Sequence, residues 1–298
     1  MIIQERPPPF DKYMQPEPPV SPEQANLRLW VERLAIPRHI VANARNNRHV
    51  ADVLATAFEA LDLVVSRQGI YGNVVALPRR CEGQRVTFVS AHYDSVPHCP
   101  GADDNASGLA VMLECARMIQ QQDPRAPVGF VAFNAEEDGL LGSRDFVERG
   151  LVELPCRLGT THVLEMLGYR SAHDAPPSRP PLWWMPKSVR AQDYVALLGM
   201  GPSNKIVGRA RKLQVSPNLR VLTAKTLAIA HKLAPDITRS DHMAYWERDV
   251  PATLWTDTGD FRNPNYHRAS DTPSTLDYDF MTEITALVHA VVLDEAAH

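Results

Sequence analysis

Histidine and acidic residues follow short apolar segments at four places in this sequence, and both residue types can bind a metal ion. His92 and Asp104 come after the apolar segment 86–91, Glu136 and Glu137 after 128–133, Glu165 near the end of 161–166, and His267 beyond 253–255. Neutral imidazole nitrogen and carboxylate oxygen are ligands that zinc and other divalent cations accept in proteins. No cysteine is among these candidates, which favours a catalytic metal site over a structural one.

The spacing within two of these places adds roles. His92 and Asp94 are two residues apart at the end of a strand, so they face the same side and Asp94 can accept a hydrogen bond from the far ring nitrogen of His92. Glu136 and Glu137 are adjacent and point in different directions. One of them can therefore bind metal while the other stays free as a general base.

Each place also has a simpler structural explanation. A single His-x-Asp occurs often by chance, paired glutamates usually form a solvated surface, and Asp103-Asp104-Asn105 before a helix can be a capping loop. The ordered combination of all four places favours a functional site.

The elements that must position these residues alternate between strands and helices. Mostly apolar runs without polar alternation predict buried strands, at 74–77, 86–91, 128–133, 161–166 and 253–255. Helical patterns lie at 47–62, 106–121, 142–149, 218–232 and 278–295. This alternation predicts an α/β domain with a mostly parallel, mixed central sheet and helices on both faces. In such sheets ligands bind beyond the carboxyl ends of the strands, where the four places would meet.

Proline marks the division of the chain. Seven of the 25 prolines lie within 7–22 and five within 176–186. We predict a proline-rich N-terminal arm over 1–20, a single domain over 21–298, and a loop excursion over 170–190 within it. The first helix is expected to begin with Ser21 as its N-cap and Pro22 at its first position.

Composition excludes several classes of protein. The 298 residues carry a formal net charge of −4 and no Lys/Arg-rich run, which argues against nucleic acid as a partner. No stretch approaches the roughly 18 apolar residues of a membrane span. The N-terminus has no secretory-signal pattern, which predicts a cytoplasmic protein, or a secreted one if a signal was removed. The cysteines show no CxxC spacing and are expected to be free thiols: Cys81, Cys99, Cys115 and Cys156.

Five motifs in order resemble the M28 metallopeptidases, the group of co-catalytic zinc aminopeptidases and their relatives. They are HYDSVPHCPGADDNASG, FNAEEDGLLGS, LEMLGY, SDHMAYW and NPNYHRASDT, spread over about residues 70–290. The resemblance implies the zinc-exopeptidase fold, which is phosphorylase/hydrolase-like. It also implies two Zn²⁺ ions per chain, with other divalent metals as alternatives. The implied ligands are His92, Asp104, Glu137, Glu165 and His267.

Within this implied site, Asp104 would bridge the metals, with His92 and Glu165 completing one of them and Glu137 and His267 the other. Many aminopeptidases of the family have aspartate where this chain has Glu165. The extra methylene is compatible with coordination and can alter the geometry or occupancy of that metal.

The resemblance also assigns catalytic roles. Glu136 would be the general base, taking a proton from the attacking water and delivering it to the leaving amine, and Asp94 would orient His92. Tyr266, next to His267, is a candidate hydroxyl donor to the developing oxyanion, with ordinary packing as the alternative.

Four further residues are candidates for substrate binding. Asp241 and His242, in SDHMAYW, resemble a segment that lines the active-site cleft in this family, with capping of a helix after Ser240 as the alternative. Trp183 and Trp184 could wall a specificity pocket or pack the excursion onto the domain.

The resulting hypothesis is a zinc-dependent hydrolase of amide bonds, an aminopeptidase acting on peptides or small amides with a free N-terminus. One alternative is a glutaminyl-peptide cyclotransferase, a relative that uses one zinc and the substrate's own amine as nucleophile. The other is a non-catalytic binding module on the same fold. The full ligand set and Glu136 favour the hydrolase, and homo-oligomerisation is left open.

Overall fold

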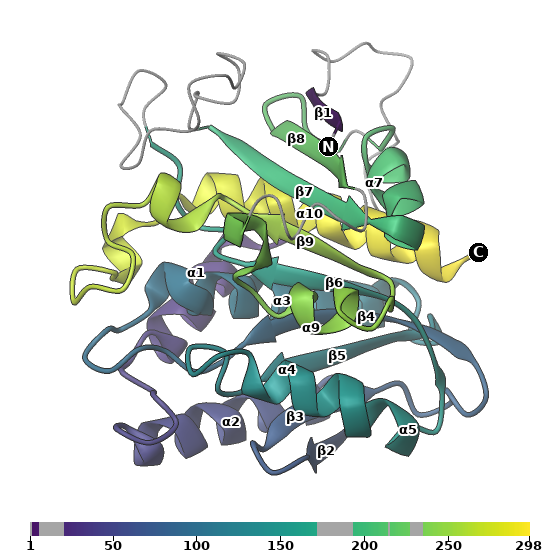
Figure 1. The fold of residues 1–298 in the computed structure, drawn as a ribbon, viewed down its shortest axis with the longest axis horizontal. Helices are drawn as coiled ribbons and strands as arrows, with labels where there is room; N and C mark the ends of the chain where they lie inside the picture. Colours follow the sequence, from purple (N-terminus) through teal and green to yellow (C-terminus); the bar gives the residue numbers. More distant parts are fainter. Residues whose placement is uncertain (1, 6–20, 172–192, 214, 227–234) are drawn as a thin grey trace.

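A nine-stranded mixed β-sheet runs through the computed structural model, which describes residues 2–5, 21–171, 193–213, 215–226 and 235–298 (Figure 1). The strands within these ranges are β1 (Ile2–Glu5), β2 (Val64–Gln68), β3 (Asn73–Leu77), β4 (Arg85–His92), β5 (Val128–Phe133), β6 (Arg157–Glu165), β7 (Tyr194–Met200), β8 (Arg220–Thr226) and β9 (Ala252–Thr256). Their order across the sheet is β1-β8-β7-β9-β6-β4-β5-β3-β2.

Parallel pairing is continuous through the middle of this sheet. β5, β4, β6 and β9 are neighbours that all run in the same direction, and β7 and β8 form a second parallel pair. The remaining pairings, β1 with β8, β7 with β9, β3 with β5 and β2 with β3, are antiparallel. The predicted mixed α/β sheet is confirmed, and its parallel part carries the candidate metal ligands.

Helices cover both faces of the sheet (Figure 1). Those of the described residues are α1 (Gln24–Leu34), α2 (Ala44–Glu59), α3 (Gly108–Gln122), α4 (Leu141–Asp145), α5 (Leu151–Glu153), α7 (Asn204–Ala210), α9 (His242–Trp246) and α10 (Tyr278–Ala296). α1, α3 and α10 pack against one another behind the sheet in Figure 1, while α4 and α9 lie in contact in front of it.

Alternate residues of the central strands feed two separate cores. Val74 and Ala76 of β3 pack in the core beneath α1, α2, α3 and α10. Val75 and Leu77 of the same strand pack in the core that also contains Phe146. Because side chains alternate across a strand and both faces are covered, β3 is buried throughout and apolar from Val74 to Leu77, which confirms the prediction of a buried strand there.

The helix predicted over 218–232 is wrong in its described part. Residues Arg220–Thr226 form β8, which pairs in parallel with β7 and antiparallel with β1. A segment of this length is too short for the spacing of its apolar residues to distinguish a strand from a helix. Here the pairing with β7 and β1 determines that it is a strand. Residues 227–234 lie outside the described residues.

The start of the first helix also differs from the prediction. α1 begins at Gln24, and its N-cap is Glu23, whose side chain makes no capping bond. The approach to the helix is held instead by α3, because Glu23 N donates to Glu114 Oε1 (2.7 Å) and the Ser21 carbonyl accepts from Arg117 (3.0 Å). Tertiary contacts therefore replace the predicted Ser21 cap.

The predicted arm and excursion fall largely outside the described residues. Of the arm, Ile2–Glu5 forms the edge strand β1, and residues 6–20 are not described. Residues 172–192 of the excursion, with Trp183 and Trp184, are likewise outside the described residues. The division of the chain into arm and domain stays a prediction.

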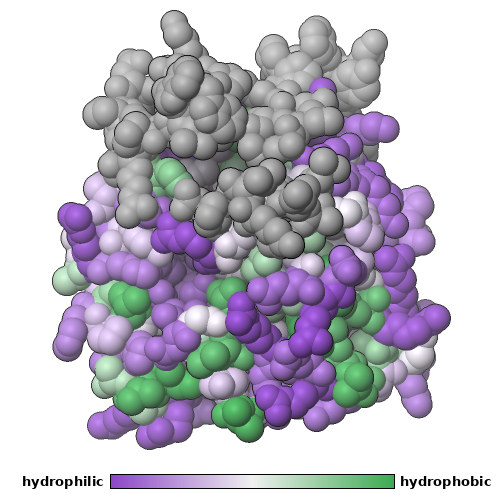
Figure 2. All heavy atoms as spheres, viewed as in Figure 1, coloured by the Kyte–Doolittle hydropathy of each residue, from purple (hydrophilic) through white to green (hydrophobic). Residues whose placement is uncertain are grey.

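Two expectations from composition can be compared with the structure. All four cysteines are buried and free. Among the described residues, no helix has both the length and the apolar character needed to cross a bilayer. On the face drawn in Figure 2, apolar patches lie among hydrophilic side chains.

Candidate metal centre and active site

Four parallel strands end at the same edge of the sheet, and the candidate ligands lie there. His92 is the last residue of β4 and Glu165 the last of β6. Glu136 and Glu137 follow β5, and His267 lies in the loop after β9. The structure thus brings together residues that are up to 175 positions apart in the sequence, at the edge where the sequence pattern predicts a site.

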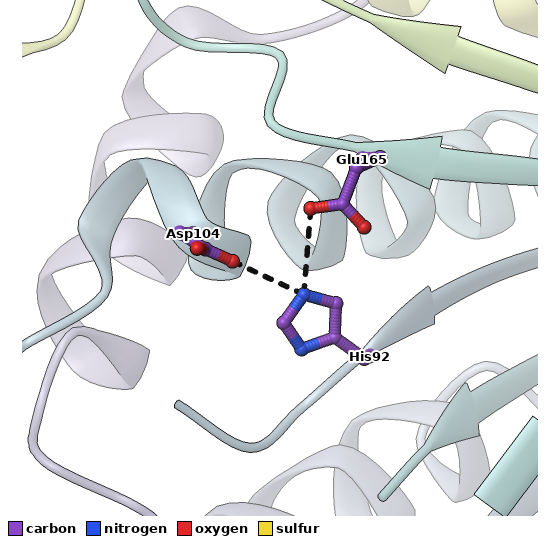
Figure 3. Close-up of side chains that lie close together, drawn as sticks. All are labelled: His92, Asp104 and Glu165. Carbon is purple, nitrogen blue, oxygen red and sulfur yellow. Dashed lines mark ion pairs between the residues drawn. The ribbon is translucent and has the colours of Figure 1, made fainter. Parts of the chain in front are cut away.

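The first group of ligand atoms, called here the His92 cluster, consists of His92, Asp104 and Glu165 (Figure 3). His92 Nε2 lies 3.1 Å from Asp104 Oδ1 and 3.5 Å from Glu165 Oε1. The His92 side chain is fully buried, and 14% of the Glu165 side chain is exposed.

The second group, the His267 cluster, consists of Asp104, Glu137 and His267. His267 Nε2 lies 3.2 Å from Asp104 Oδ2 and 3.0 Å from Glu137 Oε2. Asp104 belongs to both clusters and turns one carboxylate oxygen toward each. His267 is the most open of the ligand candidates, with 34% of its side chain exposed.

The donor atoms of both clusters fit divalent cations. Among the described residues, both ring nitrogens of His92 and Oε1 of Glu137 are buried without a hydrogen-bond partner. Buried polar atoms are rarely left unpaired, so the orphaned state of His92 Nε2, which faces Asp104 and Glu165, is accounted for if it ligates an ion, while Nδ1 faces Asp94. Two imidazoles and three carboxylates form a donor set suited to zinc. Each cluster could hold one ion, with Asp104 shared.

Residues of the segment 101–107 hold Glu165 from both sides. The Asn105 side chain donates to the Leu164 carbonyl (2.8 Å) and accepts from the Met166 amide (3.1 Å). The Ser107 hydroxyl accepts from the Leu167 amide (2.9 Å). The end of β6 is therefore fixed to the segment that carries Asp104.

Two further acids tie the same segment to the loop of His267. The Asp271 carboxylate accepts from the amides of Asp103 (2.9 Å) and Asp104 (3.1 Å). Asp103 in turn accepts from the Gly168 amide (2.8 Å) and from Asn263 Nδ2 (2.6 Å). Sequence reasoning assigned no role to Asn105, Asp103 or Asp271, although they lie in the motifs GADDNASG and NPNYHRASDT.

The fully buried Arg38 binds the backbone at the start of the segment 101–107. The Arg38 guanidinium donates to the carbonyls of Tyr93 (2.7 Å), Pro100 (2.5 Å) and Gly101 (3.0 Å). Burial lowers the pKa of Arg38, and the nearby carboxylate of Asp104 opposes this. No local pattern distinguishes Arg38 from the other arginines, so the sequence alone could not identify it.

Replacing Arg38 with methionine is expected to lower the free energy of unfolding by at least about 3 kcal/mol, because it leaves three buried carbonyls without a donor. Urea denaturation of the wild type and the variant measures this loss. The matched control is Arg144→Met, which removes an exposed ion pair with Glu247 and should change stability by less than about 1 kcal/mol. Equal losses in the two variants would contradict the structural role of Arg38.

Asp94 supports the two glutamates rather than forming the predicted hydrogen bond with His92. Its carboxylate accepts from the backbone amides of Glu136 and Glu137, both at 3.1 Å. His92 Nδ1 lies 3.4 Å from Asp94 Oδ1, and His92 makes no hydrogen bond there. The Asp94 oxygens are directed to the two amides, and the predicted role of Asp94 in orienting His92, whose Nδ1 lies next to it, stays a prediction.

The electrostatics around Glu136 suit proton transfer. Burial raises the pKa of Glu136 well above its usual range, the carboxylates of Glu165 and Glu137 raise it further, and His92 opposes them. Burial also raises the pKa of Glu137, to about 7. A carboxyl group with a raised pKa can take up a proton and hold it near neutral pH, as a general base and acid must.

Tyr266 lies against the His267 cluster. Its ring stacks on the His267 ring with 3.7 Å between centroids and 20° between the planes. Its hydroxyl accepts a hydrogen bond from Arg239 Nη2 (3.1 Å). Burial raises the pKa of Tyr266, so the phenol keeps its proton and remains a donor.

The SDHMAYW motif lies beside the centre, but its two predicted substrate-binding residues are fully buried. His242 interacts through Nε2 with the Ile237 carbonyl (2.7 Å) and contacts Trp246 edge-on. Asp241 is the N-cap of α9, and its side chain makes no capping bond. Both side chains are fully buried in this structure, and their role in substrate binding stays a prediction.

Ser240, which sequence reasoning did not single out, contacts the ligand candidate Glu165 directly. Its hydroxyl donates to Glu165 Oε2 (2.8 Å), while Glu165 Oε1 faces His92. One oxygen of Glu165 is thereby occupied and the other is turned to the His92 cluster. The only signal in the sequence was the position of Ser240 next to Asp241.

Two buried histidines predict a loss of stability in acid. Burial lowers the pKa of both His242 and His289 to about 4. An exposed histidine titrates at about 6.5, so the unfolded chain binds more protons than the folded one as the pH falls from there toward 4. The contribution of these two histidines to the free energy of unfolding therefore decreases over this range, whereas carboxyl groups with a raised pKa, such as Glu137, contribute in the opposite direction in the metal-free protein.

The measurement is urea denaturation at pH 7 and pH 5 of the metal-free wild type and of His289→Leu. The variant should lose about 2 kcal/mol less than the wild type between these pH values, because it lacks one of the two groups. Identical losses would show that His289 titrates normally in the folded protein.

A buried centre of imidazoles and carboxylates at the carboxyl edge of a mixed α/β sheet is typical of metal-dependent hydrolases. A family model described as "Peptidase family M28" matches residues 73–172. The uncharacterised protein YfbL of Escherichia coli K12 is 31% identical over 286 residues, covering 89% of this chain and 85% of that protein. The chain belongs to peptidase family M28, as the motifs predicted.

Solved structures show the same fold. The LapA aminopeptidase of Legionella pneumophila has a TM-score of 0.71 at 19% identity, over 93% of this chain and 72% of that one. A glutaminyl cyclase of Bacteroides thetaiotaomicron has a TM-score of 0.65 at 18% identity, over 92% and 99%. BSAP, a zinc aminopeptidase from Bacillus subtilis, has a TM-score of 0.51 at 26% identity, over 74% of this chain and 49% of that one. This chain thus aligns with about half the length of BSAP.

Proposed function

We propose that this protein is a zinc aminopeptidase that releases N-terminal residues from peptides and binds two zinc ions. The observation that carries the proposal is the position of Asp104, whose two oxygens face two separate clusters of ligand atoms. His92 and Glu165 would complete one ion, and Glu137 and His267 the other. Bound zinc would supply an acidified water and a polarised scissile carbonyl.

The proton transfers fall to Glu136. It takes the proton of the attacking water and later delivers it to the leaving amine, so that the amine departs neutral. Its raised pKa supports both directions of transfer, and the hydrogen bonds from the amides of Glu136 and Glu137 to Asp94 hold the turn that presents it.

Tyr266 is the proposed donor to the oxygen of the scissile carbonyl, which gains negative charge during attack. The stacking of the Tyr266 ring on the His267 ring supports this role, because it fixes the phenol beside a ligand candidate.

The preference for a free N-terminus follows from the charge of the centre. Glu136, Glu137 and Glu165 surround a small volume with carboxylate groups, and the same carboxylates raise the pKa of Glu136. Bound zinc ions would offset the charge of the carboxylates that ligate them, so the attraction for the cationic α-amino group of a peptide would come from carboxylate oxygens that are not used as ligands, and an acylated terminus lacks that positive charge.

The experiment combines zinc content with three substrates. Purified protein loaded with zinc is measured for metal per chain, and is then given an unblocked peptide, its N-acetylated form, and a peptide with N-terminal glutamine. We expect two zinc ions and release of the first residue from the unblocked peptide alone.

A second candidate is a glutaminyl-peptide cyclotransferase, favoured by the fold shared with the Bacteroides glutaminyl cyclase over 92% of this chain. One zinc ion with cyclisation of N-terminal glutamine and no hydrolysis would support it and overturn the aminopeptidase. A chain that binds zinc yet converts none of the three substrates would indicate a binding module.

A further inference from the structure

Arg239 is joined to Tyr266 at the rim of the centre. Its Nη1 donates to both carboxylate oxygens of Asp260, at 3.2 Å and 3.1 Å. Its Nη2 donates to the hydroxyl of Tyr266 at 3.1 Å. The guanidinium carbon also lies 5.7 Å from the centroid of the Tyr266 ring. Asp260, Arg239 and Tyr266 therefore form a chain of three linked side chains.

Tyr266, the last of these three side chains, contacts the His267 cluster. Tyr266 stacks on the His267 ring, whose Nε2 is 3.0 Å from Glu137 Oε2 and 3.2 Å from Asp104 Oδ2. The phenol is therefore held on one side by an imidazole of the centre and on the other by a guanidinium that is itself held by a carboxylate.

In the hydrogen bond between Arg239 and Tyr266, only Arg239 can be the donor. A guanidinium has donors and no acceptor, and it stays protonated, so it must donate to the phenol oxygen. That oxygen has a single proton of its own and cannot direct it at Arg239. The proton is left for another acceptor, and a charged donor on the oxygen strengthens the bond that the hydroxyl then makes.

We propose that Arg239 is a positioning residue that turns the Tyr266 hydroxyl so that it donates to the oxyanion formed on the scissile carbonyl. The proposal deepens the proposed hydrolase function and depends on it. Asp260 fixes the guanidinium, and Arg239 acts on the reaction only through Tyr266. A lysine at position 239 would keep the charge but could not donate to Asp260 and Tyr266 through two rigid arms.

The test is a double-mutant cycle on the zinc-loaded protein with Arg239→Met, Tyr266→Phe and the combined variant. We expect Arg239→Met to lower kcat roughly 10-fold with little change in KM, because the lost interaction develops in the transition state. In the Tyr266→Phe background, Arg239→Met should lower kcat almost no further. Arg239→Lys should recover part of the lost kcat, and zinc content should stay constant.

Arg144→Met provides the matched control. Arg144 is also partly exposed and paired with an acid, Glu247, but it has no contact with Tyr266. It should leave kcat and KM unchanged.

A second readout does not need turnover. An aminoalkylphosphonate places anionic oxygens where the oxyanion would form, and its affinity for the zinc-loaded variants is measured by calorimetry. Arg239→Met should weaken binding roughly 10-fold in the wild-type background and leave it unchanged in the Tyr266→Phe background.

The outcomes separate the two hypotheses. If the effects of Arg239→Met and Tyr266→Phe multiply, Arg239 does not act through Tyr266 and the inference is wrong. Equal phosphonate affinity of wild type and Tyr266→Phe would also overturn it. If no peptide is cleaved while phosphonate binding shows the expected cycle, the hydrolase function fails and the Arg239–Tyr266 relation stands. Absence of phosphonate binding to the zinc-loaded wild type would refute both.

Discussion

Replacing Glu136 with glutamine is expected to lower kcat by roughly 10²–10⁴-fold while the protein stays folded and keeps its zinc. Glutamine has nearly the same shape but cannot take up a proton. Glu136 is not part of either ligand cluster, so the metal sites should be retained.

The measurement is kcat on an unblocked peptide, with zinc content and far-UV circular dichroism on the same samples. Asp138→Asn is the matched control, because Asp138 is a nearby acid that interacts with His39 rather than with the centre. Turnover that equals the wild type would refute the assignment of Glu136 as the base. Loss of zinc would instead assign it as a ligand.

Replacing Asp104 with alanine is expected to have the largest effect on metal binding. Its two oxygens face the two clusters, so its removal should weaken zinc at both positions by more than the roughly 10–100-fold that outer supporting residues contribute. Activity should be lost with the metal. The segment 101–107 should keep its position in the variant, because Asp271 accepts hydrogen bonds from the backbone amides at positions 103 and 104.

Equilibrium dialysis against a competing chelator measures zinc per chain. His267→Ala is the informative comparison, because it removes a ligand from the His267 cluster alone and leaves the His92 cluster intact. We expect loss of both ions in the first variant and of one in the second. Full stoichiometry in Asp104→Ala would exclude it as a shared ligand.

Much of the architecture was predictable because it depends on short-range patterns. The buried strands of the middle of the sheet are apolar on both faces, and that composition is visible without a structure. The parallel order places their carboxyl ends together, so residues that follow them could be expected to meet. For the same reason Glu165, at the end of β6, could be grouped with His92 at the end of β4.

The two wrong predictions of secondary structure, the helix over 218–232 and the N-cap at Ser21, have a common physical cause. Arg220–Thr226 is short and mixes apolar with polar residues, so its state depends on pairing with β7 and β1 rather than on local propensity. Ser21 has the residue type of an N-cap, but contacts with α3 determine where α1 begins.

The residue types and their order by themselves predicted the class of site: imidazoles and carboxylates at strand ends, with one glutamate as a candidate base beside another as a candidate ligand. The tertiary structure decided which atoms face one another and what holds them. It placed Asp104 between two clusters, directed Asp94 to backbone amides, and brought Arg38, Ser240 and Arg239 to the centre. These three act through contacts with residues far away in the chain. Such contacts leave no pattern in the neighbouring sequence, so only the folded structure shows them.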